Sequence, residues 1–472
     1  MLNSFLKDKI LEEFSFKPTN NQNLLLTKLS DFIFSENENE LFLLKGYAGT
    51  GKTTVISALV KSLKKLKQKT FLLAPTGRAA KVLSSYSKTP AYTIHKKIYR
   101  QKTATDNMGS FALDRNFHKD TLFIVDEASM IAGNTYSNSI FGSGDLLSDL
   151  IEYVYNGNNC KLILIGDTAQ LPPVGLDLSP ALDKEYIEKN FYRNVIQVVL
   201  TEVVRQTQES GILYNATNLR DLIKNEESIF PKFQLKNYTD IQRVSGADLI
   251  EEISSSYYNF GQEDTIIVTR SNNRANKFNQ GIRNSILYRE EELSQGDYLM
   301  VVKNNYFWLD KNEDVDFIAN GDIVEIVKIK KYYELYNRRF AEVTVRFLDY
   351  KDLEIDTKIM LDTLSIDTPA LTADENREFY YKIAEDYPEI RNKRKLFEKI
   401  RENEFFNALQ VKFAYCVTCH KAQGGQWKSV FVDIGYLTDE MLGKEFYRWL
   451  YTAVTRSTEK LYLVNFKDEF FE

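Results

Sequence analysis

The chain has 472 residues, 43% of them hydrophobic and 27% charged, with a net charge of −5. This composition is typical of a globular protein long enough for several domains, and it excludes a disordered chain or a basic protein that coats DNA nonspecifically. No apolar run approaches the roughly 20 residues of a membrane span. The first residues contain acids without a small-residue cleavage site, and three cysteines provide no disulfide framework. We therefore expect a cytoplasmic protein without a secretory signal or a membrane partner.

A glycine-rich segment, KGYAGTGKTT (45–54), lies between an apolar run (41–44) and an amphipathic one (55–66). It fits the pattern GxxxxGK[ST] at every fixed position. In this pattern backbone N–H groups surround phosphate oxygens, Lys52 reaches the β- and γ-phosphates, and the Thr53 hydroxyl binds Mg²⁺. The following helix adds the positive end of its dipole. The segment predicts a nucleotide site made by Gly46, Ala48, Gly49, Thr50, Gly51, Lys52, Thr53 and Thr54.

Two later strands end in polar residues. The apolar TLFIV (121–125) is followed by Asp126 and Glu127. We expect Asp126 to hold Mg²⁺, directly or through water, and Glu127 to orient and deprotonate an attacking water. The run KLILIGDTAQLPPVG (161–175) places Gln170 where an amide can contact both a γ-phosphate and a neighbouring domain. Acids at strand ends are often plain solvated loop residues, but a buried strand that follows a phosphate loop favours nucleotide hydrolysis.

These segments belong to a longer ordered set. It comprises GYAGTGKTT, LLAPTGRAAKVL, TIHK, VDEAS, GDTAQLPPVG, LTEVVRQTQESGILYNATNLR, VTCHKAQGGQW and YTAVTRS. The set resembles the motifs of superfamily 1 helicases, most closely the RecD-like and Dda-like (1B) branch, and covers residues 18–460. The resemblance implies an ATP-driven 5′-to-3′ DNA helicase that uses ATP and Mg²⁺.

The resemblance also implies an α/β fold with two RecA-like P-loop domains. A small hairpin is expected in the first domain, and an SH3-like β segment plus a helical arm in the second. The expected boundaries are 1–95 and 121–205 for the first domain, 96–120 for its insertion, 206–300 and 410–472 for the second domain, and 301–409 for its insertion.

Four further residues match nucleotide-contacting positions of the family. Arg205 and Arg456 match arginines that stabilise charge on the transferring γ-phosphoryl, a role worth roughly 10³–10⁵ in rate. Either one alone could equally be a surface ion-pair residue. Gln22 matches a glutamine that reads adenine, although the same amide fits a capping box with Thr19. Gln426 matches a ribose-contacting position that is usually glutamate, so its contact is in question.

Five residues match positions that hold a single nucleic-acid strand in the family: Pro75, Thr76, His95, Thr418 and His420. Such contacts position a strand without reading its sequence. Buried, hydrogen-bonded histidines are the ordinary alternative. We expect Thr418 and His420 to end one apolar strand, VKFAYCVTCH (411–420). Cys416 and Cys419 lie in that run, but with only Cys160 besides they cannot supply four zinc ligands, and we interpret them as packing residues.

The sequence patterns within the two insertions are less specific than the motifs above. Asp106, Asn107 and Gly109 predict a hairpin or loop within 99–120, either a duplex-splitting pin or a solvated loop. Residues 265–283 predict a strand and then a helix. The ranges 296–308, 317–329 and 340–350 predict short β segments, and 371–406 predicts two helices separated near Pro388. The basic RNKRK run within that arm is better explained by a solvated helix face than by a phosphate contact.

Three functions remain open. The first is a helicase that acts on single-stranded DNA and duplex junctions. The second is a translocase that strips proteins from single strands without unwinding. The third is a catalytically silent binding module of a recombination complex, against which the intact Lys52, Glu127 and Arg456 argue. Whether RNA is also bound, and which proteins are partners, cannot be read from the sequence.

Overall fold

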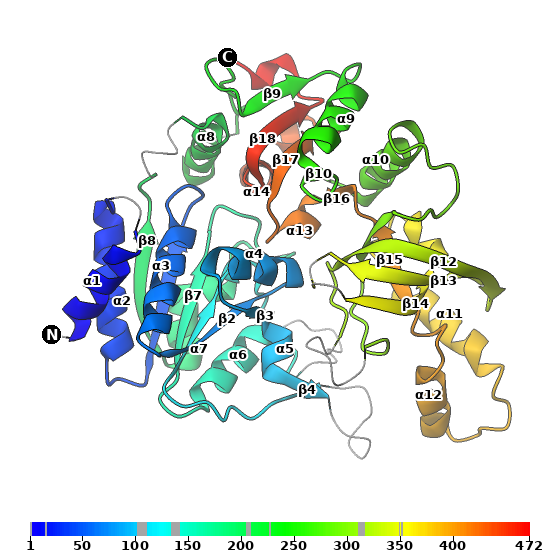
Figure 1. Ribbon diagram of the computed structural model, residues 1–472, viewed down its shortest axis with the longest axis horizontal. Coiled ribbons are helices and arrows are strands. Elements are labelled where there is room, and N and C mark those ends of the chain that lie inside the picture. The colour runs from blue at the N-terminus through cyan, green and yellow to red at the C-terminus, as the bar shows by residue number, and fades with distance from the viewer. Residues whose placement is uncertain are drawn as a thin grey trace.

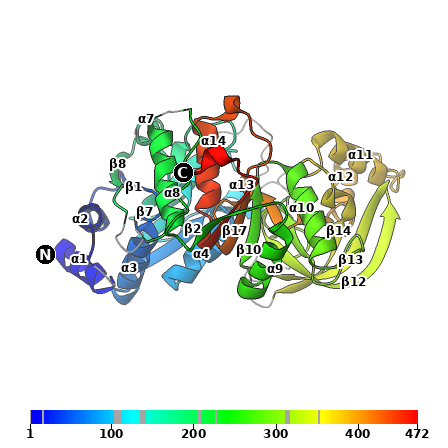
Figure 2. The same ribbon diagram turned by 90° about the horizontal axis from the view of Figure 1, so that it is seen from above.

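The computed structural model describes residues 2–14, 17–101, 111–133, 142–203, 209–225, 228–309, 317–348, 350 and 353–472. Figure 1 shows two sheets flanked by helices and, beside them, a β-barrel with two helices. Seen from above, the N-terminal helices and the barrel lie at opposite ends of the long axis, with the second sheet between them (Figure 2). None of the helices in the described ranges is long and apolar enough to cross a bilayer.

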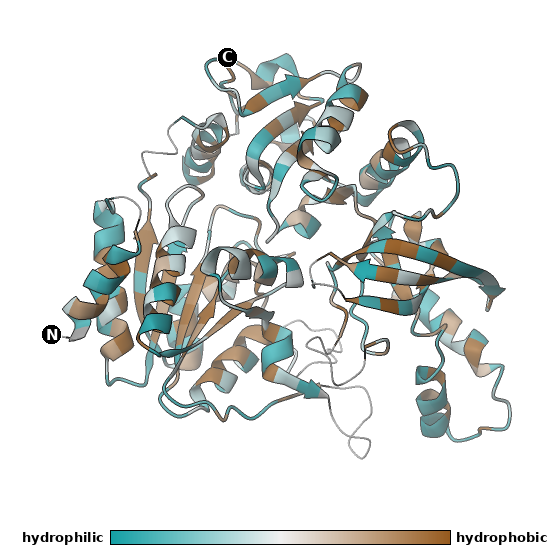
Figure 3. Ribbon diagram, viewed as in Figure 1, coloured by the Kyte–Doolittle hydropathy of each residue, from teal (hydrophilic) through white to brown (hydrophobic). Residues whose placement is uncertain are grey.

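The first sheet has six parallel strands in the order β3-β2-β6-β7-β1-β8. Their bounds are Glu40–Gly46 (β1), Lys69–Ala74 (β2), Ala91–Thr93 (β3), Thr121–Val125 (β6), Lys161–Gly166 (β7) and Asn194–Leu200 (β8). Every residue of β6 and β7 is buried. Such continuous burial is expected of a parallel sheet covered on both faces, and the central strands are mostly hydrophobic in Figure 3.

Helices cover both faces of this sheet, and each face has its own hydrophobic core. The helices are Leu2–Glu12 (α1), Asn20–Phe34 (α2), Lys52–Lys65 (α3), Gly77–Ser87 (α4), Ile94–Ile98 (α5), Leu146–Tyr155 (α6) and Lys184–Phe191 (α7). A side-chain oxygen caps several of them; that of Thr76, for example, accepts the N–H of Ala79 at the start of α4. Because the strands are parallel, the loops that enter α3 and α4 and the loops that follow β6 and β7 open at one edge of the sheet.

The second sheet has five parallel strands in the order β16-β10-β17-β18-β9. Their bounds are Ile241–Val244 (β9), Thr265–Thr269 (β10), Cys416–Thr418 (β16), Trp427–Asp433 (β17) and Ser457–Val464 (β18). Its helices are Gly211–Asn225 (α8), Leu249–Phe260 (α9), Asn272–Ser285 (α10), Cys419–Ala422 (α13) and Lys444–Val454 (α14). The strand and helix predicted within 265–283 are therefore confirmed as β10 and α10.

A closed barrel is inserted between α10 and β16. Its strands are Tyr298–Val301 (β11), Ile323–Leu335 (β12), Arg338–Phe347 (β13), Glu354–Met360 (β14) and Leu409–Phe413 (β15). The three predicted β segments correspond to β11, β12 and β13, whereas β14 was not expected, because charged and polar residues interrupt its sequence EIDTKIM. Residues 301 and 409, where we expect the insertion to begin and end, lie in β11 and β15.

The helical arm consists of Ala373–Ala384 (α11) and Lys393–Arg401 (α12), as predicted on either side of Pro388. Both pack on the barrel through a cluster that includes Phe340 and Phe379. In the first domain, Tyr99–Gln101 (β4) pairs antiparallel with Phe111–Leu113 (β5), which confirms a hairpin. The turn predicted at Asp106, Asn107 and Gly109 lies outside the described residues.

One strand prediction is wrong. The apolar run 411–420 is divided between β15 of the barrel and β16 of the second sheet. The division lies at Ala414 and Tyr415, where the backbone changes partners: Ala414 N–H donates to Tyr298, and the Tyr415 carbonyl accepts from Ile267. Thr418 ends β16 as expected, but His420 lies in α13. Cys419 is the first residue of that helix, so the two cysteines do not share a strand.

Candidate active site

The glycine-rich loop connects β1 to α3 and has the backbone that only glycine adopts readily. Gly49 and Gly51 have φ angles of 75° and 83°. A Cβ on Gly46 would lie 2.9 Å from Cγ of Lys52, and a Cβ on Gly49 would lie 3.3 Å from the Leu213 side chain. The loop is therefore a concave backbone surface with no room for side chains. This is the shape that a phosphate group requires.

Lys52 is the first residue of α3, and its ammonium lies inside the loop. Nζ donates to the carbonyl oxygens of Gly46 at 2.5 Å and Tyr47 at 2.9 Å. The same Nζ lies 3.9 Å from the Asp167 carboxylate, which is 1% exposed. A cation held over a glycine cradle is the arrangement expected of a lysine that binds nucleotide phosphates.

A cavity of about 330 Å³ opens above the loop and is lined by both halves of the molecule. The predicted site residues that line it are Ala48, Gly49, Gly51, Lys52, Thr53, Thr54, Asp126, Glu127, Gln170, Gln426 and Arg456. The first nine come from the first domain, in loops and the first turn of α3, and the last two come from the second domain. Ordering these loops at one edge brings together residues that are about 400 positions apart in the sequence.

Asp126 and Glu127 follow β6 directly. One carboxylate oxygen of Asp126 accepts the N–H of Glu127 at 2.8 Å. The other accepts the hydroxyl of Tyr86 at 2.5 Å, a contact that sequence reasoning missed. Glu127 has a φ of 54°, which is unusual for a residue with a side chain and is typical of strained functional positions. Both oxygens of Asp126 are thus oriented by hydrogen bonds.

The ionisation of Glu127 is shifted by its surroundings. Burial raises its pKa above the ordinary value, Arg456 opposes this, and the charge of Asp126 adds to it. A raised pKa brings a carboxylate closer to the range in which it accepts and releases protons at neutral pH. Glu127 is therefore chemically suited to act as a general base, while Asp126 is suited to hold a cation.

The segment after β7 is held by the second sheet. Tyr451 of α14 accepts the N–H of Ala48 at 2.8 Å and donates to Oδ2 of Asp167 at 2.7 Å. Leu171 N–H donates to the hydroxyl of Thr452 at 2.8 Å, and its carbonyl accepts from Gln423 at 2.7 Å. These bonds join the phosphate loop, the end of β7 and α14 into one polar interface. Tyr451 lies in the quoted run YTAVTRS, but its role was not anticipated.

Arg456 is 3% exposed, which excludes the surface ion-pair interpretation. Its guanidinium donates to the carbonyls of Thr452 at 3.0 Å and Gly425 at 3.1 Å and to the Thr455 hydroxyl at 3.3 Å. These bonds hold it at the cavity wall, on the side opposite to the glycine-rich loop. The other predicted arginine, Arg205, lies outside the described residues.

Gln22 forms the capping box that was the alternative to adenine contact. Its side-chain oxygen accepts the N–H of Thr19 at 3.0 Å, and Thr19 Oγ1 accepts the N–H of Gln22 at 3.3 Å. Its amide nitrogen donates to the Thr50 carbonyl at 3.1 Å. Gln22 is 1% exposed and supports the glycine-rich loop from behind. Adenine contact by Gln22 remains a prediction.

The residues present fit a nucleotide and Mg²⁺. The side-chain oxygen of Gln170 is buried in the cavity lining and has no hydrogen-bond partner among the residues that the structure describes. A buried acceptor without a partner is costly, which is consistent with a partner supplied by a ligand or its water. The Thr53 hydroxyl and the Asp126 carboxylate line the same cavity, and such oxygen ligands are those that Mg²⁺ prefers.

Two of the predicted nucleic-acid contacts, Thr76 and Thr418, lie beside residues of the barrel. Thr76 precedes α4, and a Cβ on Gly424, just after α13, would lie 3.3 Å from its Oγ1. Thr418 precedes α13, and its hydroxyl does not cap that helix. Pro75 and Thr76 are thus beside the segment that carries Thr418. The structure brings these parts of the two sheets together.

The histidines differ in exposure. His95 lies in α5, where burial lowers its pKa to about 4, so it is neutral at ordinary pH. His420 is exposed, and partial desolvation lowers its pKa.

Two lysines near Thr418 were missed: burial lowers the pKa of both Lys412 and Lys421 to about 8. Lys421 adjoins His420 in the quoted VTCHK, so the motif itself was the signal that could have identified it.

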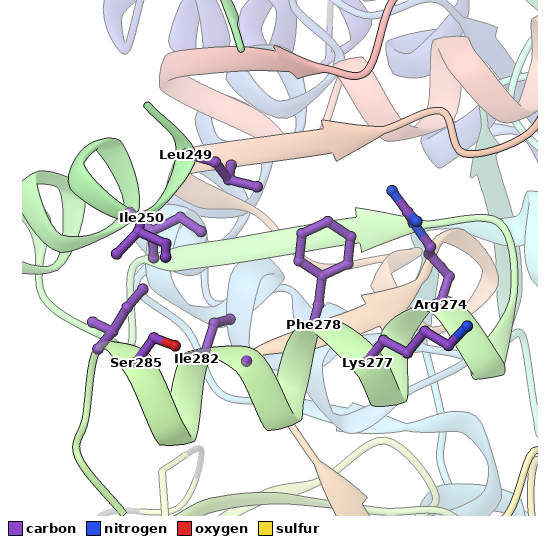
Figure 4. Close-up of a pocket in the computed structure, with 10 residues that line it drawn as sticks. Leu249, Ile250, Arg274, Lys277, Phe278, Ile282 and Ser285 are labelled. Carbon is purple, nitrogen blue, oxygen red and sulfur yellow. The ribbon is translucent and has the colours of Figure 1, made fainter. Parts of the chain in front are cut away.

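A second hollow lies away from this site, between α9 and α10. Leu249, Ile250, Phe278 and Ile282 line it, and Arg274 and Lys277 stand at one end (Figure 4). Its volume is about 230 Å³. The guanidinium of Arg274 is bound in a bidentate manner by Asp433. The hollow shares no lining residue with the cavity over the glycine-rich loop.

Two family models match the chain. An AAA domain model matches residues 33–227, and a UvrD-like helicase C-terminal domain model matches residues 413–464. The first match includes the glycine-rich loop and the ends of β6 and β7, and the second includes Arg456. The two models therefore cover both walls of the cavity.

The relatives span most of the chain. RecBCD enzyme subunit RecD of Buchnera aphidicola is 26% identical over 92% of this chain and 71% of its own length. ATP-dependent DNA helicase dda of enterobacteria phage T4 is 24% identical over 89% of this chain and 93% of its own. An uncharacterized protein of Acanthamoeba polyphaga mimivirus is 25% identical over 93% of this chain and 98% of its own length. Other relatives are longer, and the chain spans 47% of ATP-dependent RecD2 DNA helicase of Deinococcus radiodurans.

The structure of Bacteroides Pif1 helicase with ADP-AlF3 and ssDNA aligns with a TM-score of 0.49 at 16% identity, over 97% of this chain and 95% of that chain.

Proposed function

We propose that this chain, which belongs to the superfamily 1B helicases of the RecD-like and Dda-like kind, hydrolyses ATP to move along single-stranded DNA and unwind duplex. The observation that carries the proposal is the composition of the cavity. It combines a phosphate loop, a carboxylate suited to act as a base and a buried arginine from a second domain. A cavity that is complete only when two domains meet is what a motor requires, because hydrolysis can then change their relative position.

The hydrolytic step follows from the side chains. A water oxygen attacks the γ-phosphorus, its proton passes to Glu127, and the bond to the β-phosphate oxygen breaks to leave ADP and phosphate. Lys52 from one wall and Arg456 from the other offset the negative charge of the transferred group. Thr53 and Asp126 would hold Mg²⁺, which when bound neutralises charge on the β- and γ-phosphates. Gln170 and the bonds from Tyr451 connect the phosphate end of the site to α14.

Arg205, Gln22 and Gln426 complete the proposed nucleotide site. Arg205 adds a second positive charge, Gln22 contacts adenine after its amide exchanges the bond that it makes to Thr50, and Gln426 contacts the ribose. The support for these three roles is the match to the family motifs, together with the place of Gln426 in the cavity lining. The proposed domains are those expected from the sequence, with the barrel and the helical arm forming one inserted unit.

A single DNA strand is proposed to lie across both sheets. Pro75, Thr76 and His95 contact it from the first domain, and Thr418 and His420 from the second. The support is the proximity of the segments that carry Thr76 and Thr418. Because α4 begins at this track and then lines the nucleotide cavity through Ala79, Val82 and Tyr86, strand binding and ATP turnover can be coupled. The polarity is proposed to be 5′ to 3′, because the sequence of the Arg205–Arg220 segment is similar to that of RecD-like helicases.

An ATPase assay with and without single-stranded DNA tests the proposal. Purified wild-type protein should release phosphate slowly alone and much faster with an oligodeoxythymidine. Lys52→Ala, which removes the phosphate-binding cation, is the control for contaminating ATPases. A wild-type protein that hydrolyses ATP no faster than Lys52→Ala would refute the motor and favour a binding module. Oligoribonucleotides in the same assay decide whether RNA also stimulates hydrolysis.

A further inference from the structure

Helix α4 contacts both the barrel and the second domain. At its start, a Cβ on Gly77 would lie 2.6 Å from Oδ1 of Asp322 in the barrel. The Arg78 guanidinium lies 4.1 Å from the centre of the Trp427 ring in the second domain. The ammonium of Lys81 donates to the carbonyl of Leu348 in the barrel at 2.8 Å. Helix α4 therefore lies between the barrel and the second domain and contacts both (Figure 1).

From its first turn onward, α4 runs along the nucleotide cavity, which Ala79, Val82 and Tyr86 line. The helix has 11 residues and so extends roughly 16 Å from the proposed strand track. Tyr86, in its last turn, lines the nucleotide cavity and donates its hydroxyl to Oδ2 of Asp126 at 2.5 Å. The backbone carbonyl of Tyr86 accepts the hydroxyl of Ser57 in α3 at 2.8 Å. The tyrosine is thus fastened to the helix of the phosphate loop.

The Tyr86 hydroxyl is the donor in its bond to Asp126, because a carboxylate oxygen can only accept. A carboxylate oxygen has two lone pairs, so Oδ2 can accept the phenol and still face a cation or its water. The N–H of Glu127 holds the other oxygen. Tyr86 therefore determines which way the Asp126 carboxylate is turned.

We propose that Tyr86 is a positioning residue through which α4 transmits strand binding and domain movement to the metal-holding carboxylate of Asp126. This inference rests on the proposed function, since it assigns a further residue to the same site. Strand binding beside Thr76 shifts α4, the shift changes the bond between Tyr86 and Asp126, and the affinity of the site for Mg²⁺ changes with it. The predicted signature is metal affinity that depends on the strand.

The test measures metal affinity rather than turnover. Mg²⁺ is titrated into wild-type protein and Tyr86→Phe with a fluorescent ADP analogue, with and without oligodeoxythymidine. Groups that orient metal ligands typically change metal affinity by roughly 10- to 100-fold. In the wild type, the strand should lower the Mg²⁺ concentration at half-saturation. In Tyr86→Phe that concentration should be roughly tenfold higher, and the strand should no longer change it. Mn²⁺ binding followed by electron paramagnetic resonance provides a second readout.

Two further variants make the result specific. Tyr192→Phe, at an 86% exposed position of the same domain, should behave as wild type. Ser57→Ala removes the bond to the Tyr86 backbone while keeping the phenol, and should shift metal affinity in the same direction by a smaller factor. Wild-type values for both Tyr86→Phe and Ser57→Ala would overturn the inference. A wild-type protein without DNA-stimulated ATPase would instead refute the proposed function, so the two failures are distinguishable.

Discussion

The hydroxyl of Tyr451 lies 2.7 Å from Oδ2 of Asp167, although the two residues are 284 positions apart and belong to different sheets. The same hydroxyl accepts the N–H of Ala48 in the phosphate loop at 2.8 Å. One side chain of the second domain therefore bridges a backbone donor of the nucleotide site and the carboxylate beside Lys52. The two domains therefore meet through polar groups that a bound nucleotide would also approach, namely the Ala48 N–H and the Asp167 carboxylate.

Tyr451→Phe should lower DNA-stimulated turnover without weakening nucleotide binding. The change removes a bond to a charged acceptor, typically worth about 1.5–3 kcal/mol, and uncouples α14 from the phosphate loop. We expect the stimulated kcat to fall roughly tenfold or more, with the binding of a fluorescent ADP analogue unchanged or tighter. Tyr447→Phe is a matched control, because it lies on the same helix and its hydroxyl bonds the backbone of Ile229 instead. Equal kinetics for the two variants would contradict the role of Tyr451.

Glu127→Gln should bind ATP and fail to hydrolyse it, because the amide keeps the shape of the side chain but cannot accept a proton. Lys52→Ala should lose both binding and turnover. Phosphate release and equilibrium nucleotide binding, measured on both variants, separate the two effects. Normal turnover by Glu127→Gln on single-stranded DNA would show that another group is the base.

The pH dependence of turnover should carry the signature of Glu127. Burial raises its pKa, so the protonated, inactive form persists to higher pH than in an exposed glutamate. As a base it must be ionised, and kcat should therefore fall as pH decreases through this raised pKa. The stimulated rate measured from about pH 5 to about pH 9 should show this acidic limb. A rate that stays constant down to the ordinary pKa of a glutamate would show that the shift has no functional effect.

Arg456→Ala should bind ATP nearly normally but lose most DNA-stimulated hydrolysis. The side chain is buried at the cavity wall, and arginines that contact the transferring phosphoryl are worth roughly 10³–10⁵ in rate. Arg456→Lys keeps the charge but not the three bonds of the guanidinium, and should recover little. An unchanged rate in Arg456→Ala would transfer the role to Arg205.

Unwinding should require a 5′ tail. Duplexes with a 5′ tail, a 3′ tail or none are mixed with the protein, ATP and Mg²⁺, and strand separation is followed by fluorescence. We expect only the 5′-tailed duplex to open. Preference for a 3′ tail would refute the polarity and leave the ATP-driven motor intact. Hydrolysis on all strands without separation of any duplex would favour the translocase that strips proteins.

The two sheets, and the meeting of the predicted site residues in one cavity, follow from local patterns in the sequence. Asp126 and Gln170 lie in the loops that follow two apolar strands, and the parallel arrangement brings such loops to one edge whatever the sequence between them. The Tyr86 contact with Asp126 was not predictable, because nothing in the run LSSYSKT distinguishes that phenol from a surface one. The division of the run 411–420 between two sheets at Ala414 was missed for a related reason, because an apolar run does not indicate which sheet it joins.

The described phosphate loop also has a kinetic consequence. Lys52 is bound to two carbonyls of its own loop, and the Ala48 N–H is bound to Tyr451. An incoming nucleotide finds these donors occupied and can engage them only after the loop has released them. Association should therefore proceed in two steps, and its observed rate should level off at high nucleotide concentration instead of rising linearly. The plateau would report how fast the empty loop opens, and Tyr451→Phe should raise it.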